Sequence, residues 1–163
     1  MNALSPQPVE RLNLDDRKRA ATRATTAFCL RQVQLVGTLV EGEFLLGLLL
    51  MTIIDANSRH LDDPSCGERY QALDDVPPDA VRRPISVMAL SQSVGLPYET
   101  TRRYVGRLIR LGLCQRVDRG GLIVPANVIS QDRAKALTER SFQDVRRLVV
   151  ALRRAGVDID SMR

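Results

Sequence analysis

Apolar residues recur with a helical period along most of this 163-residue chain. Spacings of three and four residues place apolar side chains on one face of a helix, whereas short unbroken apolar runs between turn residues favour strands. The pattern predicts a mainly α-helical protein with one small β-hairpin. Helices are predicted over residues 15–40, 43–59, 87–94, 98–111 and 130–155, and the two hairpin strands over 113–117 and 122–124.

The most informative stretch is residues 85–125, where two short amphipathic segments precede the hairpin. Gly95-Leu96-Pro97 separates the two segments, Gly112 follows the second, and Asp118–Gly121 forms the hairpin turn. Glycine and proline at these points favour tight turns. Helix, turn, helix and hairpin is the layout of a winged helix-turn-helix, whose second helix enters the major groove of DNA. The expected recognition helix is 97–111 and the expected wing is 113–124.

The second helix has two contrasting faces. Thr101 (through its methyl group), Tyr104, Val105, Leu108 and Leu111 form the apolar face. The opposite face carries four arginines together with other residues: Tyr98, Glu99, Arg102, Arg103, Gly106, Arg107 and Arg110. Arginine is suited both to guanine edges and to phosphate. A solvated charged face on an ordinary helical hairpin is the alternative, and the adjoining turn and hairpin favour DNA binding.

These positions predict a division of roles on DNA. Side chains in the first two helical turns would contact base edges, namely Tyr98, Glu99, Arg102 and Arg103. Glu99 would accept from a cytosine amino group. Phosphate contacts, which fix register, would come from Thr100, Arg107, Arg110, Arg116 and Arg119. The predicted function is sequence-specific binding of double-stranded DNA for transcriptional regulation. The alternative is a winged-helix protein-interaction module that does not bind DNA.

The same block resembles the DNA-binding domains of bacterial winged helix-turn-helix transcription regulators of the GntR and IclR families. The resemblance covers about 40 residues and rests on a turn glycine, a threonine pair, an arginine, an apolar pair, a leucine and a Gly-Leu pair. These are Gly95, Thr100-Thr101, Arg103, Tyr104-Val105, Leu108 and Gly112-Leu113. Thr101 departs from the larger aliphatic residue usual there, and nothing in this chain matches either family's ligand-binding domain.

Residues 44–54 are apolar on nearly every side of the predicted second helix, and such a helix must be covered almost completely. Burial between two subunits would provide that cover, so we expect a homodimer. The expected interface consists of Phe44, Leu45, Leu48, Leu49, Leu148 and Leu152. A central helix wrapped by the chain's own terminal helices is the alternative. The run is shorter than the roughly 20 residues that span a bilayer, so no membrane association is expected.

The expected organisation has four parts. Residues 1–14 form a flexible arm, 15–42 an N-terminal helix, 43–125 the winged domain with a polar linker at 60–83, and 126–163 a C-terminal helix and tail. The net charge of +5 is unevenly distributed: residues 86–125 have six basic and two acidic side chains, whereas 41–85 have four and nine. A basic block beside an acidic one favours a nucleic-acid face.

Composition argues against enzymatic function. With one histidine and no nucleotide-binding loop, no catalytic triad or cofactor site can be assembled, so we expect no enzyme, cofactor or metal. His60, Asp62, Asp63 and Cys66 lie close together but make a poor ligand set, and Cys66 is a candidate redox switch. Cys29 and Cys114 are expected in the core. Sparse cysteines and no signal pattern favour the cytoplasm.

Overall fold

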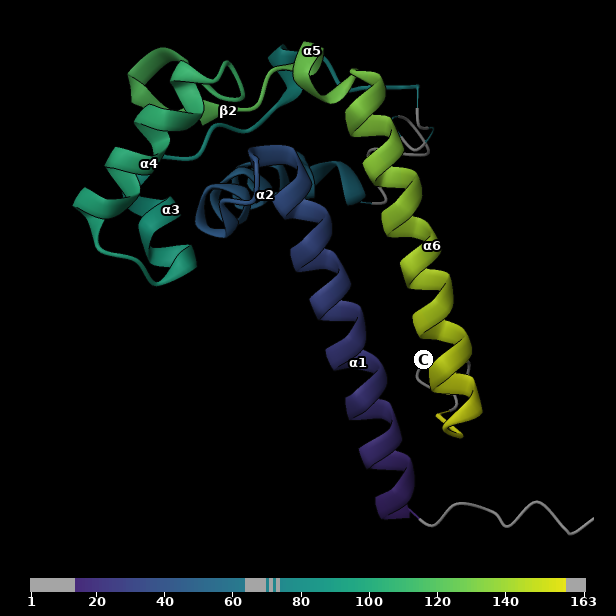
Figure 1. Cartoon of the computed structure of the whole chain (residues 1–163). Coiled ribbons are helices and arrows are strands. Elements are labelled where there is room, and N and C mark those ends of the chain that lie inside the picture. Colours follow the sequence, from purple (N-terminus) through teal and green to yellow (C-terminus); the bar gives the residue numbers. More distant parts are fainter. Residues whose placement is uncertain (1–13, 64–69, 71, 73, 158–163) are drawn as a thin grey trace, which may run out of the picture. The chain divides into compact units, whose positions relative to one another are not determined.

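A computed structural model describes residues 14–63, 70, 72 and 74–157. The protein is mainly helical with a two-stranded antiparallel sheet, as the hydrophobic pattern predicts (Figure 1). The expected arm, the end of the C-terminal tail and Cys66 lie outside the described residues. The elements are α1 (Leu14–Gly37), η1 (Thr38–Val40), α2 (Phe44–Ser58), η2 (Arg59–Asp62), η4 (Asp79–Val81), α3 (Val87–Val94), α4 (Tyr98–Arg110), β1 (Gln115–Arg116), η5 (Asp118–Gly120), β2 (Leu122–Ile123), α5 (Ala126–Ile129) and α6 (Asp132–Arg154).

The chain divides into two compact units. Val33–Ser141 form the central unit, and Met1–Gln32 with Phe142–Arg163 form the terminal unit, so that α1 and α6 each contribute to both. The central unit extends beyond the expected winged domain of 43–125 at both ends, because the end of α1 and the start of α6 belong to it.

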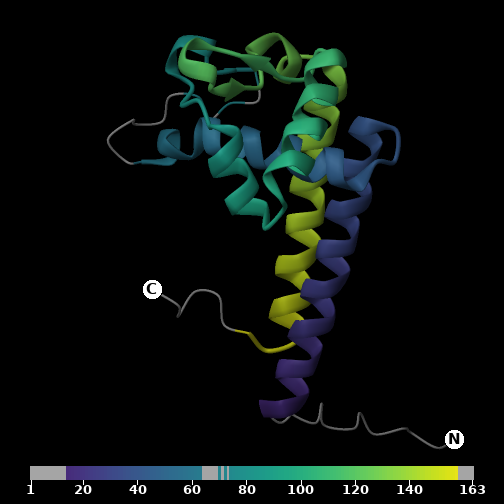
Figure 2. The ribbon, with the colours of Figure 1, turned by 90° about the vertical axis from the view of Figure 1, so that its left-hand side faces the viewer.

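Helix α2 is the central helix of the central unit. Its side chains pack with those of α3, α4 and β2 into one core, whose buried members are Val40, Leu46, Leu49, Leu50, Ile53, Val87, Leu90, Val105, Leu108, Cys114, Leu122 and Val124. Gly47 lets α2 approach the end of α1, since a Cβ added there would lie 2.3 Å from Val36 Cγ1. Figure 2 shows α2, α3 and α4 lying together.

This packing corrects one expected interface position. Leu49 is 0% exposed within its own chain and therefore cannot contact a partner. The side of α2 that carries Leu46, Leu49, Leu50 and Ile53 is covered within the same chain by α3, α4 and β2, and not by the terminal helices alone as the alternative supposed. Phe44 remains 48% exposed, while Leu45 and Leu48 are half-buried.

The stretch Phe44–Asp62 is longer than the apolar run expected from the sequence. It spans 19 residues, and its mean hydropathy reaches 1.2 over a window of 18 residues, so it is long and apolar enough to cross a membrane by length and composition alone. Core helices meet the same criterion, and Leu46, Leu50 and Ile53 face the core of the central unit. We therefore interpret α2 as a core helix.

The terminal unit is an antiparallel pair formed by the first part of α1 and the second part of α6, seen side by side in Figures 1 and 2. Arg31 Nε lies 3.0 Å from Asp144 Oδ1, and Asp144 also accepts from Arg147 at 3.1 Å. Cys29, expected in the core, is exposed. The expected apolar stripe of α6 is only partly covered, since Phe142 and Val145 are 58% and 41% exposed.

Candidate nucleic-acid interface

A tight turn between α3 and α4 fixes the direction of α4. Ser86 caps α3, because its Oγ accepts from the backbone N–H of Ala89 at 3.1 Å. Gly95 ends α3 with φ of +69°, a left-handed conformation that glycine adopts without steric cost. Pro97 then precedes the first residue of α4, where a missing N–H costs nothing. Gly95 and Pro97 therefore form the turn between the two helices, as predicted from the sequence.

The inner face of α4 explains why threonine is accepted at position 101. Thr101 is 0% exposed and packs near Val105 and Leu108 on the buried side of the helix. Its Oγ1 donates to the Pro97 carbonyl at 3.2 Å. The hydroxyl is therefore satisfied within the helix and leaves the methyl group for the core, so that the departure from an aliphatic residue carries no unpaired polar atom.

The outer face of α4 is accessible. The side chains predicted to contact bases all lie on the surface: Tyr98, Glu99, Arg102 and Arg103 are exposed. Of the predicted phosphate contacts on α4, Arg110 is exposed, while Thr100 and Arg107 are half-buried. The helix therefore presents at its surface most of the side chains that the sequence assigned to DNA.

Two of the four arginines on α4 are paired with carboxylates, which sequence reasoning did not predict. Arg102 Nε donates to Glu99 Oε2 at 2.9 Å, one turn earlier. Arg107 forms two hydrogen bonds with Glu43, one of them at 2.7 Å, and so connects α4 to the residue preceding α2. These hydrogen bonds raise the pKa of both guanidinium groups above the usual range. Neutralisation by Glu43 reduces the charge that Arg107 offers to a phosphate.

Tyr104 organises the arginines on either side of it. The guanidinium carbons of Arg103 and Arg107 each lie 5.6 Å from its ring centroid. At this distance a cation is attracted by the ring face. The ring therefore restricts Arg103, an exposed side chain on the outer surface, and gives it a preferred orientation before any ligand binds.

The hairpin lies directly after α4 and is shorter than predicted. Gln115 pairs with Ile123 and Arg116 with Leu122, and Val117 N–H donates to the Gly121 carbonyl at 2.9 Å to close the turn. Leu122 also forms a bridge with Ile85, through hydrogen bonds of 2.8 and 3.1 Å. The segment at Ile85 thus pairs with β2 as a third extended segment. It had no periodic signal in the sequence, and the sequence analysis did not predict it.

Both arginines expected on the hairpin are exposed. Arg119 occupies the tip with φ of +60°, and Arg116 donates to the Gly120 carbonyl at 3.3 Å. A positive φ is uncommon at a non-glycine residue, and here it belongs to the tight turn at the hairpin tip. Both side chains are therefore available at the surface of the hairpin.

A buried amide holds the hairpin against α2. Asn57, 0% exposed, donates through Nδ2 to the carbonyls of Arg83 and Leu122 at 2.8 and 3.1 Å. Its Oδ1 accepts from the Val124 N–H at 2.9 Å. One side chain therefore joins the end of α2, the segment before α3, and β2.

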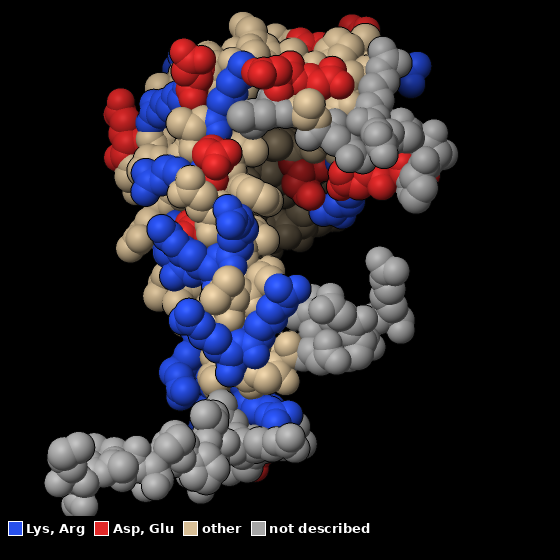
Figure 3. Space-filling view, turned by 90° about the vertical axis from the view of Figure 1, so that its right-hand side faces the viewer, with Lys and Arg blue, Asp and Glu red and all other residues tan. Residues whose placement is uncertain are grey.

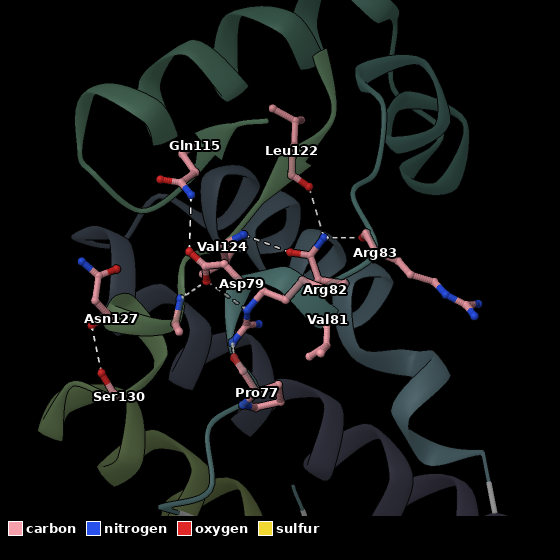
Figure 4. Close-up of polar contacts among 12 residues, drawn as sticks. Pro77, Asp79, Val81, Arg82, Arg83, Gln115, Leu122, Val124, Asn127 and Ser130 are labelled. Carbon is pink, nitrogen blue, oxygen red and sulfur yellow. Dashed lines mark hydrogen bonds and ion pairs between the residues drawn. The ribbon is translucent and has the colours of Figure 1, made fainter. Parts of the chain in front are cut away.

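The second anchor lies in the part expected to be a polar linker (Figure 4). Arg82 is buried, donates to the Pro77 carbonyl at 2.8 Å and lies 3.5 Å from Asp79. Burial lowers the pKa of Arg82, and Asp79 opposes that effect. Asp79 also accepts from Gln115 on β1 at 3.5 Å and from the Ala126 N–H at 2.7 Å. The described end of the linker is therefore fastened to the hairpin.

The remaining candidate chemistry is weak. His60 Nε2 lies 2.9 Å from the Val81 carbonyl, which ties η2 to the same segment. No group of three or more His, Cys, Asp or Glu side chains that could hold a metal occurs among the residues that the structure describes. Cys114 is buried, and burial raises the pKa of its thiol to about 11.

No family model, no curated protein and no solved structure matches this chain.

Proposed function

We propose that the central unit is a winged helix-turn-helix and that the protein binds double-stranded DNA sequence-specifically to regulate transcription. The order of α3, turn, α4 and hairpin agrees with that motif, and the resemblance to the DNA-binding domains of GntR and IclR regulators favours the same assignment. The observation that carries the proposal is the exposed outer face of α4 beside the exposed arginines of the hairpin.

The charge distribution of the central unit supports this assignment. Residues 33–141 contain thirteen basic and thirteen acidic side chains, yet residues 86–125 alone contain six and two. The remainder of the unit therefore has seven basic and eleven acidic side chains, so the helix-turn-helix and hairpin are positive and the rest is negative. Such a separation attracts and orients a polyanion.

Roles on DNA follow from position. Tyr98, Glu99, Arg102 and Arg103 in the first turns of α4 would contact base edges. Arg110, Arg116 and Arg119 would contact phosphates. Arg107 would do so only by exchanging Glu43 for a phosphate, since Glu43 accepts both of its hydrogen bonds in the structure.

The test is selection of bound duplexes from a random pool, followed by binding to the enriched sequence and to random DNA. Arg103→Ala should lose roughly 1–3 kcal/mol of specific binding and relax the preference at one base position. Arg133→Ala is the matched control, because Arg133 is an exposed arginine of the central unit outside the proposed interface. If the selection enriches no sequence, the proposal is overturned and a protein-interaction module is favoured. An equal loss on both DNAs would make Arg103 a phosphate contact.

A further inference from the structure

The terminal unit lacks a hydrophobic core in its described part. Among residues 15–32 and 142–157, only Asp144 and Ala155 are buried, at 7% and 4% exposure. Helices in proteins owe most of their stability to the packing of an apolar face, and two helices alone enclose little surface. Four large apolar side chains among the described residues of this unit are exposed: Leu30, Phe142, Val145 and Val150.

Helix α6 carries a partly exposed apolar seam, which comprises Phe142, Val145, Val149 and Leu152. The spacings of three, four and three residues are those of the a and d positions in a heptad. Phe142 and Val145 are 58% and 41% exposed, and Val149 and Leu152 are half-buried. Asp144, which pairs with Arg31, marks the side of α6 that faces α1, so the seam lies beside that contact.

We propose that a second copy of this chain docks on the seam and forms a homodimer through α6. The seam contains no charged side chain, and heptad spacing is the pattern by which one helix packs along an identical one. The inference rests on the terminal unit and is independent of the proposed DNA binding. It keeps Leu152 from the expected interface, adds Phe142, Val145 and Val149, and excludes Leu49.

Charge distinguishes a second copy from other occupants. The described residues of the terminal unit contain nine basic and three acidic side chains, a net charge of +6. Figure 3 shows Lys and Arg side chains gathered over its helices. An acidic protein or an anionic membrane would be drawn to the arginines, such as those that line a groove of about 710 Å³ with Val150: Arg146, Arg147 and Arg154. The uncharged seam is the surface that two basic copies can share.

The exposed area indicates a dimer of modest affinity. A side chain of this size has a full accessible area of roughly 150–200 Å². Multiplied by the exposed fractions, this gives roughly 250 Å² of exposed area for the four seam residues of each copy. A dimer would thus remove roughly 500 Å² of apolar surface at the seam alone, near the apolar part of the smallest stable interfaces. We expect a dissociation constant in the micromolar range.

Two substitutions on α6 form a matched test. Val145 and Val150 are both valines, 41% and 47% exposed, and lie on different faces of the same helix. Val145→Glu would place an unpaired charge in each half of the seam and should weaken dimerisation by at least roughly 100-fold. Val150→Glu should leave it unchanged. Because both side chains are exposed in the single chain, neither substitution buries a charge in the monomer, and circular dichroism should confirm equal folding.

Sedimentation equilibrium over roughly 1–100 µM gives the answer. The proposal requires a dimeric unsubstituted chain, a monomeric Val145→Glu variant and a dimeric Val150→Glu variant. A monomer throughout that range, or equal weakening by the two substitutions, would overturn it. Anionic vesicles that bind a monomeric chain through Val145 would identify a membrane as the occupant instead. A dimer that does not bind DNA sequence-specifically would refute only the proposed function. A monomer that binds DNA sequence-specifically would refute only the proposed dimer.

Discussion

Replacing Asn57 with alanine should destabilise the central unit, because this side chain makes three hydrogen bonds from a fully buried position. Two of its partners differ in what they would lose. The Leu122 carbonyl also accepts from the Ile85 N–H at 3.1 Å, so it keeps one hydrogen bond. The Val124 N–H would lose its partner in a residue that is 0% exposed.

The magnitude follows from those orphaned groups. A buried donor left without an acceptor costs about 1–3 kcal/mol, which applies to the Val124 N–H. The Arg83 carbonyl would also lose the Asn57 donor, but Arg83 is exposed, and water can compensate for part of that loss. We therefore expect Asn57→Ala to lower the free energy of unfolding by about 2–4 kcal/mol, most of it from the unpaired Val124 N–H.

Urea unfolding followed by circular dichroism measures this change. Asn127→Ala is the matched control, because Asn127 is exposed, and the hydrogen bond recorded for it uses its backbone carbonyl, which accepts from Ser130. The control should change the free energy of unfolding by less than about 0.5 kcal/mol. A loss below about 1 kcal/mol for Asn57→Ala would refute the reasoning, since the hairpin would then be held by apolar packing and backbone pairing alone.

Three further outcomes are expected. Replacing Arg116 and Arg119 together with alanine should reduce the log–log salt slope of DNA binding by roughly 1–2, and an unchanged slope would place the hairpin away from phosphates. Gly47→Ala should cost about 1–3 kcal/mol of stability because its Cβ would meet Val36 at 2.3 Å, whereas Gly37→Ala, with 4.0 Å to its nearest neighbour, should cost nothing in urea unfolding. Because burial raises the pKa of Cys114 from 9.0 to about 11, the unfolded chain releases this proton first, and stability should fall between pH 9 and 11. Cys114→Val should show a shallower fall in thermal melts across that window.

Local signals in the sequence were sufficient to predict α3, the turn that follows it and α4. Gly95 and Pro97 act through their own backbone, and the 3.6-residue period of α4 reports which side is buried. The exposed faces of α4 and of the hairpin could therefore be assigned before any contact was known. Each strand has two residues in the structure and is shorter than predicted, because the pattern identifies apolar runs but not the register in which they pair.

Long-range partners could not be predicted in this way. Asn57 is one polar residue at the end of an apolar helix, and its acceptors Arg83 and Leu122 lie 26 and 65 positions away. The fastening of Asp79 to Gln115 and Ala126 has the same character, so a stretch rich in proline and aspartate was interpreted as a polar linker. For α2 the pattern indicated nearly complete burial, but only one side is buried, and Phe44 and Met51 remain 48% and 42% exposed. Periodicity also does not say whether the cover belongs to the same chain or to a second one.

The same limitation applies to the charge of the candidate interface. Helical spacing places four arginines on one face of α4, but it does not show that Glu99 and Glu43 neutralise Arg102 and Arg107. For Arg103, Arg110, Arg116 and Arg119, no carboxylate lies within ion-pair distance among the described residues. If the protein binds DNA as proposed, release of counterions should therefore come mainly from Arg110, Arg116 and Arg119, the three that are assigned to phosphates. Arg102 would give up its bond to Glu99 only for a better acceptor, such as a guanine edge, which favours its use in base recognition over phosphate binding.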